Sequence, residues 1–366
     1  MRILFSGYAP VHFVCFKPLY ERLSALPGVD VYMSGGIRSG PKGNYHYDEA
    51  AMYRSFDLPG DRVLSVSAIR DLDFDVLFTA HTKLILPRSV GKTIQVFHGI
   101  SFRNKAVRPE NMSCDHYFLV GPYMKRRFVE AGLLQNDDER AVEVGFMKTD
   151  RLLNGELGRS RILNEIGFKG DRPILLYAPT GAHDNSLEIM GEEVIRQLCA
   201  SDAYDVLVKP HDHPKNRDID WAARLAPLEN DHCKVTKEPD IVRLMYVADL
   251  LISDASSAAN EFTLLDRPIV FLDTPALLDA ARLAQNSMLD LDTWGRKAGL
   301  VVHAPQEVCA AVEASLEAPR ANSDLRQAMS KDFFYHRGGA TDTAMAWLQQ
   351  HVLGAEHINA ELPLNA

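Results

Sequence analysis

Three features are scarce or missing in this chain: paired cysteines, basic runs, and apolar runs long enough to cross a membrane. The five cysteines are scattered, odd in number and never form a C-x-x-C pair: Cys15, Cys114, Cys199, Cys233 and Cys309. This spacing argues against a zinc site and predicts reduced thiols in the cytosol. The net charge is −9, so nucleic-acid binding has no electrostatic support.

We expect no signal peptide, because Met1 to Gly7 leads directly into a strand and a turn. A loose basic cluster, Lys125 to Arg127, lies beside Phe128. Contact with phosphates or an anionic membrane is one interpretation of it, and a solvated helix face is the more common one. We therefore expect a cytoplasmic protein and leave open a peripheral contact with the inner face of the cell membrane.

The length of 366 residues predicts two domains, because a single core rarely grows that large. Short apolar runs separated by helices predict an α/β fold with parallel, doubly wound sheets covered on both faces. A stretch over 167–173 has the composition of a linker. We therefore expect a first domain over 1–165, a second over 171–335, and a C-terminal helix over 336–353 that packs back across the domains.

The expected elements follow from apolar periodicity and turn residues. In the first half we expect strands at 3–5, 29–33, 75–79, 93–97 and 117–120, a helix at 14–26, and a loop with a helical turn at 44–56. In the second half we expect strands at 174–177, 204–208, 233–236, 249–252, 268–272 and 300–303, with helices at 187–199, 241–247, 258–265, 306–316 and 341–352.

Two histidines follow predicted strands of the first half, at the sheet edge where such folds bind ligands. His98 is followed by Gly99 and a polar segment that contains Arg103 and Lys105. A histidine beside cations is suited to take a proton from a hydroxyl near neutral pH. We favour this role over a structural one for His98, and interpret His81 as structural.

The segment 248–272 predicts a strand, a tight turn, a helix and a second strand. The turn contains Ser253, Asp254, Ser256 and Ser257, and the helix carries Glu261. Backbone N–H groups at a helix start and serine hydroxyls can bind an anion, although one serine is more often only a cap. A carboxylate one turn later can accept hydrogen bonds from sugar hydroxyls, so the pattern suggests a nucleotide site.

A second cluster follows the strand at 204–208 and runs from Lys209 to Pro214. Its lysine and two histidines, His211 and His213, can hold a pyrophosphate or protonate a departing phosphate. A metal site is the alternative, but chelation is awkward at this spacing because both histidines share a face only in extended backbone. We favour the phosphate interpretation.

These motifs, in this order, resemble the CDP-glycerol glycerophosphotransferases that build teichoic-acid and capsule polymers. The resemblance covers roughly Gln95 to Leu353. It rests on six motifs and a late run before the final helix: His98-Gly99, Tyr177-Ala178-Pro179-Thr180, Lys209 to Pro214, Ser253 to Ser257, Glu261, Leu264 to Ile269, and Phe334 to Thr341.

The resemblance implies a GT-B architecture, with two Rossmann-like domains facing across a cleft and no required metal or cofactor. It implies transfer of glycerol phosphate from CDP-glycerol, or a related CDP-polyol, to a hydroxyl of a polyol-phosphate, glycan or lipid-linked acceptor. Its base histidine falls on His98, and its phosphate-binding histidine on His211 or His213, of which we favour His211. The implied donor-binding residues are Thr180, Lys209, His213, Ser253, Asp254, Ser256, Ser257 and Glu261, with Arg103 and Lys105 as acceptor-side candidates.

The chain departs from the family pattern in three places. Asp212-His213 lengthens the H-P motif, Gly181 to Asp184 replace the usual aromatic and basic residues, and Ile100 to Phe102 stand where threonine-proline is common. The alternatives are therefore a metal-independent GT-B glycosyltransferase, a nucleotide-sugar epimerase, and a nucleotide-binding protein without catalysis. The polar residues kept at several strand ends argue against the last of these.

Overall fold

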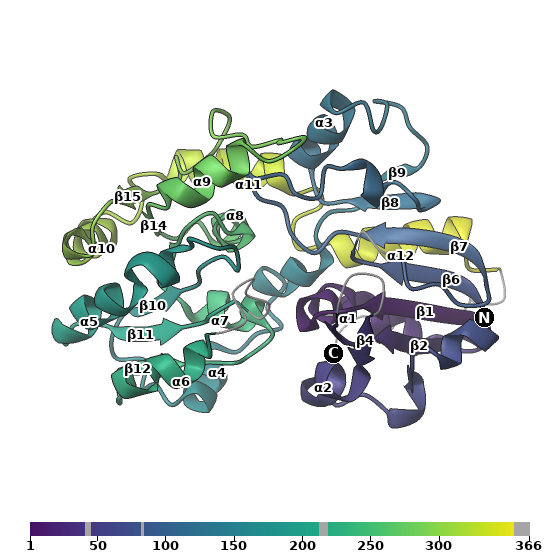
Figure 1. The fold of residues 1–366 in the computed structure, drawn as a ribbon, viewed down its shortest axis with the longest axis horizontal. Coiled ribbons are helices and arrows are strands. Elements are labelled where there is room, and N and C mark those ends of the chain that lie inside the picture. The colour runs from purple at the N-terminus through teal and green to yellow at the C-terminus, as the bar shows by residue number, and fades with distance from the viewer. Residues whose placement is uncertain (41–44, 82–83, 212–218, 355–366) are drawn as a thin grey trace. The chain divides into compact units, whose positions relative to one another are not determined.

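The computed structural model describes residues 1–40, 45–81, 84–211 and 219–354, and the chain divides into two compact units (Figure 1). The first unit contains Met1–His98, Val107–Asp150 and the chain from Phe334 onward. The second contains Gly99–Ala106 and Arg151–Phe333. Each unit is built on its own parallel sheet, as the alternating pattern predicts.

The first sheet has seven parallel strands within the described residues. In spatial order they are β5 (Val63–Leu64), β2 (Asp30–Gly35), β1 (Arg2–Gly7), β6 (Asp73–Thr79), β7 (Ser89–Val96), β8 (His116–Leu119) and β9 (Ala141–Glu143). The chain order reverses at β1, which pairs with β2 on one side and β6 on the other. This reversal is the point at which doubly wound sheets bind ligands.

The second sheet has six parallel strands among the described residues, in the Rossmann order 3-2-1-4-5-6. They are β12 (Cys233–Val235), β11 (Asp205–Val208), β10 (Ile174–Tyr177), β13 (Leu250–Ser253), β14 (Ile269–Leu272) and β15 (Leu300–Val302). The four side chains of β10 are fully buried because helices cover both faces of a parallel sheet. Here the order reverses between β10 and β13.

The first unit carries four α-helices in its described part, α1 (Pro10–Ser24), α2 (Glu49–Tyr53), α3 (Pro122–Glu130) and α12 (Ala340–His351). Short 3₁₀ turns lie at Arg54–Phe56, Gly60–Arg62, Ala68–Asp71, Pro109–Asn111 and Met147–Leu152. In the segment expected as a loop with a helical turn, α2 is that helical turn, while β4 (His46–Asp48) forms an antiparallel hairpin with β3 (Ile37–Ser39). Three-residue strands with exposed side chains are too short to show a period in the sequence.

The described helices of the second unit are α4 (Arg159–Ile166), α5 (Glu192–Ala200), α6 (Trp221–Leu225), α7 (Ile241–Val247), α8 (Ser257–Phe262), α9 (Pro275–Arg282), α10 (Val308–Glu317) and α11 (Ser323–Phe333). A π-helical turn at Leu187–Gly191 leads into α5, and 3₁₀ turns lie at Ala226–Leu228, Thr263–Leu265 and Pro305–Glu307.

The C-terminal helix α12 is anchored in the first unit by Asp150. The Asp150 carboxylate accepts hydrogen bonds from Ala340 N at 3.1 Å and from Thr341 N and Oγ1 at 2.7 Å each. Burial raises the pKa of Asp150, although these hydrogen bonds oppose the rise. A carboxylate at a helix N-terminus satisfies free N–H groups and complements the helix dipole. All of these contacts, together with packing on α1, lie within the first unit.

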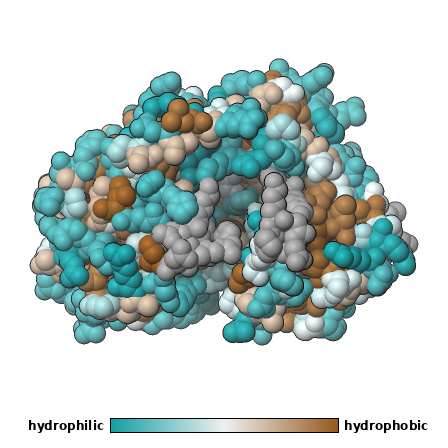
Figure 2. Space-filling model, in the orientation of Figure 1, coloured by the Kyte–Doolittle hydropathy of each residue, from teal (hydrophilic) through white to brown (hydrophobic). Residues whose placement is uncertain are grey.

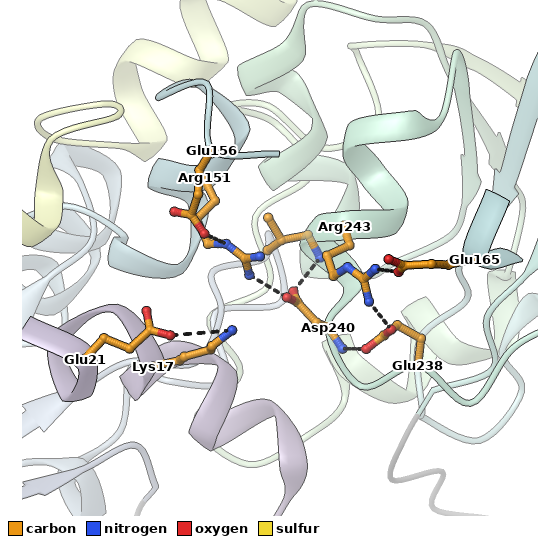
Figure 3. Close-up of polar contacts among 9 residues, drawn as sticks. Lys17, Glu21, Arg151, Glu156, Glu165, Glu238, Asp240 and Arg243 are labelled. Atoms are coloured by element: carbon orange, nitrogen blue, oxygen red, sulfur yellow. Dashed lines mark hydrogen bonds and ion pairs between the residues drawn. The ribbon is translucent and has the colours of Figure 1, made fainter. Parts of the chain in front are cut away.

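Residues 151–165, which the predicted boundary assigns to the first domain, belong to the second unit. Arg151 Nη1 forms an ion pair with Asp240 at 2.5 Å, and its Nε donates to Glu156 at 2.7 Å. Figure 3 shows how this cluster continues from Asp240 through Glu238 to Arg243, which also pairs with Glu165 of α4. These contacts join residues up to about ninety positions apart, so local sequence does not reveal them.

Candidate active site

The carboxyl ends of β10 and β13 place two predicted motifs side by side in the second unit. Tyr177 pairs with Ile252, so the segment Ala178 to Thr180 lies next to Ser253 and the turn that follows. This is the reversal of strand order, where a doubly wound sheet leaves room for a ligand. The two motifs therefore form one site at this sheet edge.

Ser253 and Asp254 hold this site together from within. Ser253 Oγ donates to the carbonyl of Ala178 at 2.7 Å. The Asp254 carboxylate accepts from Thr180 N at 2.8 Å, and from Ser186 N at 3.0 Å and Oγ at 2.9 Å. Both side chains are buried, and burial raises the pKa of Asp254. Both residues are predicted to bind ligand, and in the structure their side chains make hydrogen bonds that join neighbouring segments of the second unit.

Ser256 is an N-cap, the alternative that its sequence context also allowed. Its Oγ accepts from Ala258 N at 3.3 Å, at the start of α8. Helix α8 spans only six residues, so its dipole contributes little to anion binding. The hydrogen-bond donors at this turn are backbone N–H groups and serine hydroxyls. Ser257 is partly exposed, and Glu261, four residues later, is buried.

The Lys209 cluster begins at the carboxyl end of β11, next to β10. Lys209 is buried, its backbone N–H donates to the carbonyl of Tyr177 at 2.9 Å, and Nζ lies 3.5 Å from the carbonyl of Pro210. His211 is exposed. His213 lies outside the described residues. The structure thus brings Lys209 to the same sheet edge as Thr180.

The loop from Gly99 to Ala106 packs within the second unit, although it directly follows β7 of the first. Asn260 Nδ2 donates to the carbonyl of Ile100 at 2.9 Å, and Asp290 N donates to that of Phe102 at 2.8 Å. The Phe102 side chain is buried in a small apolar cluster with Ala255, Leu277 and Leu278. The loop is therefore part of the wall of this site.

Arg103, predicted as an acceptor-side candidate, belongs to the second unit and contacts Thr180 there. Its Nη2 donates to Thr180 Oγ1 at 2.6 Å, and the charge of Asp254 lies close enough to affect its pKa. Its Nε is buried without a hydrogen-bond partner. Burial lowers the pKa of Arg103, but a guanidinium keeps its charge near neutral pH. A fixed cation with an unused donor suits an anionic ligand. Lys105 of the same loop is exposed.

Gly99 must remain without a side chain for Ser257 to keep its orientation. A Cβ at Gly99 would lie 2.9 Å from Ser257 Oγ. Gly99→Ala should therefore force the hydroxyl into another rotamer, and we expect donor affinity to fall as much as in Ser257→Ala, by about tenfold. Calorimetric titration of CDP-glycerol measures this. Gly99→Ala should have no further effect in the Ser257→Ala background, and additive losses would contradict the contact.

His98 lies at the end of β7 in the first unit with its tautomer defined. Its Nδ1 lies 2.5 Å from the carbonyl of Ala80. A carbonyl only accepts, so Nδ1 carries the proton and Nε2 the lone pair. Desolvation lowers the pKa of His98, the hydrogen bond to Ala80 opposes this, and the charges of Lys148 and Arg108 lower it further. His98 is exposed as a residue, and its lowered pKa leaves the ring neutral near pH 7, as a general base requires.

Two aromatic residues missed in the sequence pack around His98 and His81. The His12 ring centroid lies 4.7 Å from that of His98 and 5.6 Å from that of His81, and Tyr8 lies 4.7 Å from His81. His12 belongs to the first turn of α1, and the apolar residues around it in the sequence favour a structural interpretation. The one sequence feature that links His12 to a ligand-binding edge is its position five residues after Gly7, the last residue of β1.

The described residues contain no group of three or more histidine, cysteine or acidic side chains placed to hold a metal ion. They also contain no helix with the length and apolar character needed to cross a membrane. Figure 2 shows mainly hydrophilic residues on the face drawn, with hydrophobic ones in smaller patches. In the basic cluster on α3, Lys125 pairs with Glu143 at 2.8 Å and Arg127 with Glu130 at 2.5 Å.

Solved structures define the fold class of this chain. The wall teichoic acid polymerase TagF superposes with a TM-score of 0.64 over 95% of this chain and 88% of that chain, at 17% identity. S. aureus MnaA in complex with UDP superposes with a TM-score of 0.57 over 95% and 96%, at 13% identity. These likenesses confirm the predicted GT-B class, an α/β fold of two Rossmann-like units.

The sequence defines the family within that class. Residues 68–344 match the family described as CDP-Glycerol:Poly(glycerophosphate) glycerophosphotransferase, and the chain belongs to this family. It is 25% identical over 222 residues to a teichoic acid poly(glycerol phosphate) polymerase of Staphylococcus epidermidis, covering 52% of this chain and 30% of the relative. It is 33% identical over 139 residues to a teichoic acid glycerol-phosphate primase of Bacillus subtilis, covering 37% and 33%. The chain thus spans about a third of the length of these curated relatives.

Proposed function

We propose that this chain transfers glycerol phosphate from CDP-glycerol, or a closely related CDP-polyol, to an acceptor hydroxyl and releases CMP. The observation that carries the proposal is the site at the β10–β13 reversal in a member of this family. There Arg103, held by Thr180, has a buried Nε without a partner. The product would be a phosphodiester in the synthesis of a teichoic-acid or capsule-like polymer.

On the donor side, the charges of the pyrophosphate need neutralising. Arg103 and Lys209 supply positive charge, Thr180 supplies a hydroxyl that Arg103 contacts, and Ser257 supplies a second hydroxyl from the start of α8. Hydrogen bonds between charged groups are about twice as strong as neutral ones, which favours a guanidinium here. We assign Glu261 to the ribose hydroxyls, as its position one turn after the serines suggests.

On the acceptor side, an alcohol needs a base as it attacks the β-phosphorus. His98 Nε2 takes the proton of the acceptor hydroxyl while the new P–O bond forms. The bond between the β-phosphorus and the oxygen bridging to CMP breaks, and CMP leaves with that oxygen. The bond from Nδ1 to Ala80 O holds the ring in the tautomer this step requires, because Nε2 alone then has a free lone pair.

The departing CMP gains negative charge, and we assign its stabilisation to His211 together with Lys209. His213 stays the alternative to His211. A protonated histidine beside a phosphate oxygen can neutralise the charge or donate a proton. We assign Arg103 to the same group, and its hydrogen bond to Thr180 supports this assignment.

The acceptor classes are a polyol phosphate, a glycan or a lipid-linked chain. We propose a cytoplasmic location, supported by the unpaired, scattered cysteines, with peripheral contact at the inner membrane face. The ion pairs of Lys125 and Arg127 weaken the basic cluster on α3 as a membrane contact.

A donor panel tests the proposed function. Purified protein is incubated with CDP-glycerol, CDP-ribitol and UDP-sugars together with a polyol-phosphate acceptor, and the released nucleotides are separated by chromatography. We expect CMP from a CDP-polyol and no consumption of UDP-sugars. Consumption of a UDP-sugar alone would identify a glycosyltransferase or an epimerase instead.

Turnover should persist in EDTA. Arg103, Lys209 and neighbouring N–H and O–H donors can neutralise the pyrophosphate without a divalent cation. We expect CMP release in excess EDTA to stay within about twofold of the untreated rate, since no step assigned above uses a metal. Loss of activity that Mg²⁺ or Mn²⁺ restores would show that these side chains do not suffice.

A further inference from the structure

Three of the five cysteines gather around α5 in the second unit. Cys199 is in the last turn of α5, Cys233 is the first residue of β12, and Cys309 is in α10. All three belong to, or pack against, the apolar cluster on one face of the second sheet. Neither the donor site nor the sequence motifs of the family include these thiols.

The side chains of Cys199 and Cys233 contact each other. Cys233 pairs with Val206 of β11, and α5 packs on β11, so the start of β12 lies beside this helix. The buried Cys233 side chain shares its cluster with Leu198 of α5, and Cys199 packs against the same cluster. There the two thiols are hydrogen-bonded to each other. Thiols in contact need little movement to form a disulfide, since that bond requires neighbouring Cβ atoms.

The two thiols differ in exposure and in acidity. Cys199 is partly exposed, whereas Cys233 is completely buried. The hydrogen bond from the Cys233 thiol lowers the pKa of Cys199, although burial opposes this change. The same hydrogen bond and burial raise the pKa of Cys233. Cys199 is therefore the thiol that an oxidant reaches as a thiolate, and Cys233 keeps its proton until it reacts.

We propose that Cys199 and Cys233 form a redox-sensitive dithiol that a hydroperoxide converts to a disulfide. The Cys199 thiolate attacks an oxygen of hydrogen peroxide, the O–O bond breaks, and the departing hydroxide takes the proton that Cys199 released, giving water and a sulfenic acid. The Cys233 sulfur then attacks the Cys199 sulfur, the S–S bond forms, and the sulfenic hydroxyl leaves with the Cys233 proton as a second water. The two thiols supply the two electrons that reduce the peroxide.

The disulfide connects α5 to β12, at one edge of the second sheet, and closes a loop over residues 199–233. That loop contains β11 and Lys209, which the proposed function places at the donor site. A cross-link over such a loop stabilises the folded state mainly by restricting the unfolded chain. In a reducing compartment such bonds are transient and report oxidation. The inference does not depend on the identity of the donor.

Peptide mapping of the oxidised protein tests the pair. The full chain is treated with hydrogen peroxide, the remaining thiols are alkylated, and a protease digest is analysed by mass spectrometry. We expect two peptides linked through Cys199 and Cys233, which dithiothreitol releases. Cys199→Ser should abolish this link. Absence of the link in the peroxide-treated parent would overturn the proposal.

Cys309→Ser is the matched control. Cys309 is also partly exposed and packs against the same cluster, but its Sγ donates to the carbonyl of Gln197 at 3.4 Å. We expect the link between Cys199 and Cys233 to form in this variant as it does in the parent. Loss of that link in Cys309→Ser, or a link from Cys309 to Cys199 in the parent, would contradict the proposed pairing.

Two further readouts separate the roles of the thiols. In Cys233→Ala the sulfenic acid should persist, so dimedone should label Cys199 in this variant and leave it unlabelled in the parent. Thermal unfolding of the oxidised parent, followed by circular dichroism, should show a Tm about 5–10 °C above that of the reduced parent, with no such rise in Cys199→Ser. Dimedone labelling of Cys233 in the parent, or a Tm that falls when the link forms, would overturn the proposal.

Discussion

Replacing His98 by alanine should lower kcat by about 10²–10⁴-fold while the affinity for CDP-glycerol changes little. The substitution removes the Nε2 lone pair that the hydrogen bond to Ala80 presents. It leaves Thr180, Arg103 and the serine turn in place, and these belong to the second unit. CMP release in a coupled assay gives kcat, and calorimetry gives the donor affinity.

The pH profile gives a second readout of the same variant. Desolvation and the charges of Lys148 and Arg108 lower the pKa of His98, so its neutral form persists to a lower pH than that of an ordinary histidine. The acidic limb of kcat/KM should therefore fall below the ordinary value of about 6.5, and this limb should disappear in His98→Ala.

His351→Ala, at the exposed end of α12 in the same unit, is the matched control and should turn over like the parent. Parent-like turnover in His98→Ala would instead make His98 a structural residue. The base would then be sought next at His81.

The second large effect is expected on stability. Asp254→Ala should lower the free energy of unfolding of the second unit by about 3–5 kcal/mol, because it leaves buried donors without an acceptor. These donors are Thr180 N and both the N–H and the hydroxyl of Ser186. Urea unfolding followed by circular dichroism measures the shift, and donor binding should be lost with it.

Asp249→Ala provides the comparison at the opposite end of β13. Asp249 also accepts from a neighbouring strand, from Ile174 N at 2.9 Å, but its side chain is 35% exposed. Its removal should cost about 1 kcal/mol, since water can replace the lost acceptor. Equal free energies of unfolding for the two variants would contradict a stabilising role for the hydrogen bonds of Asp254.

Much of the second unit could be predicted because its signals are local. The strand Ile174–Tyr177 and the helix Ile241–Val247 have the bounds expected from apolar runs and their periods. The resemblance assigns the serine turn and Thr180 to one donor site, and the pairing of β10 with β13 brings these two strand ends together.

The parts that could not be predicted depend on long-range contacts. The resemblance makes Arg103 an acceptor-side candidate, and local sequence does not show that its loop packs in the second unit. Asn260, which donates to Ile100 of this loop, is 160 residues away. Ser253 and Asp254 carry the chemistry of ligand donors and acceptors, and local sequence does not show their hydrogen bonds to Ala178 and Thr180. The hairpin of β3 and β4 could not be predicted either, because each of its strands spans three residues.

The identity of the nucleotide product tests the central claim most directly. CDP-glycerol is incubated with the protein and glycerophosphoglycerol, and the products are followed by ³¹P NMR. Attack at the β-phosphorus predicts CMP as a phosphomonoester and one new phosphodiester in the acceptor. Release of CDP, with no phosphorus transferred to the acceptor, would contradict glycerophosphate transfer.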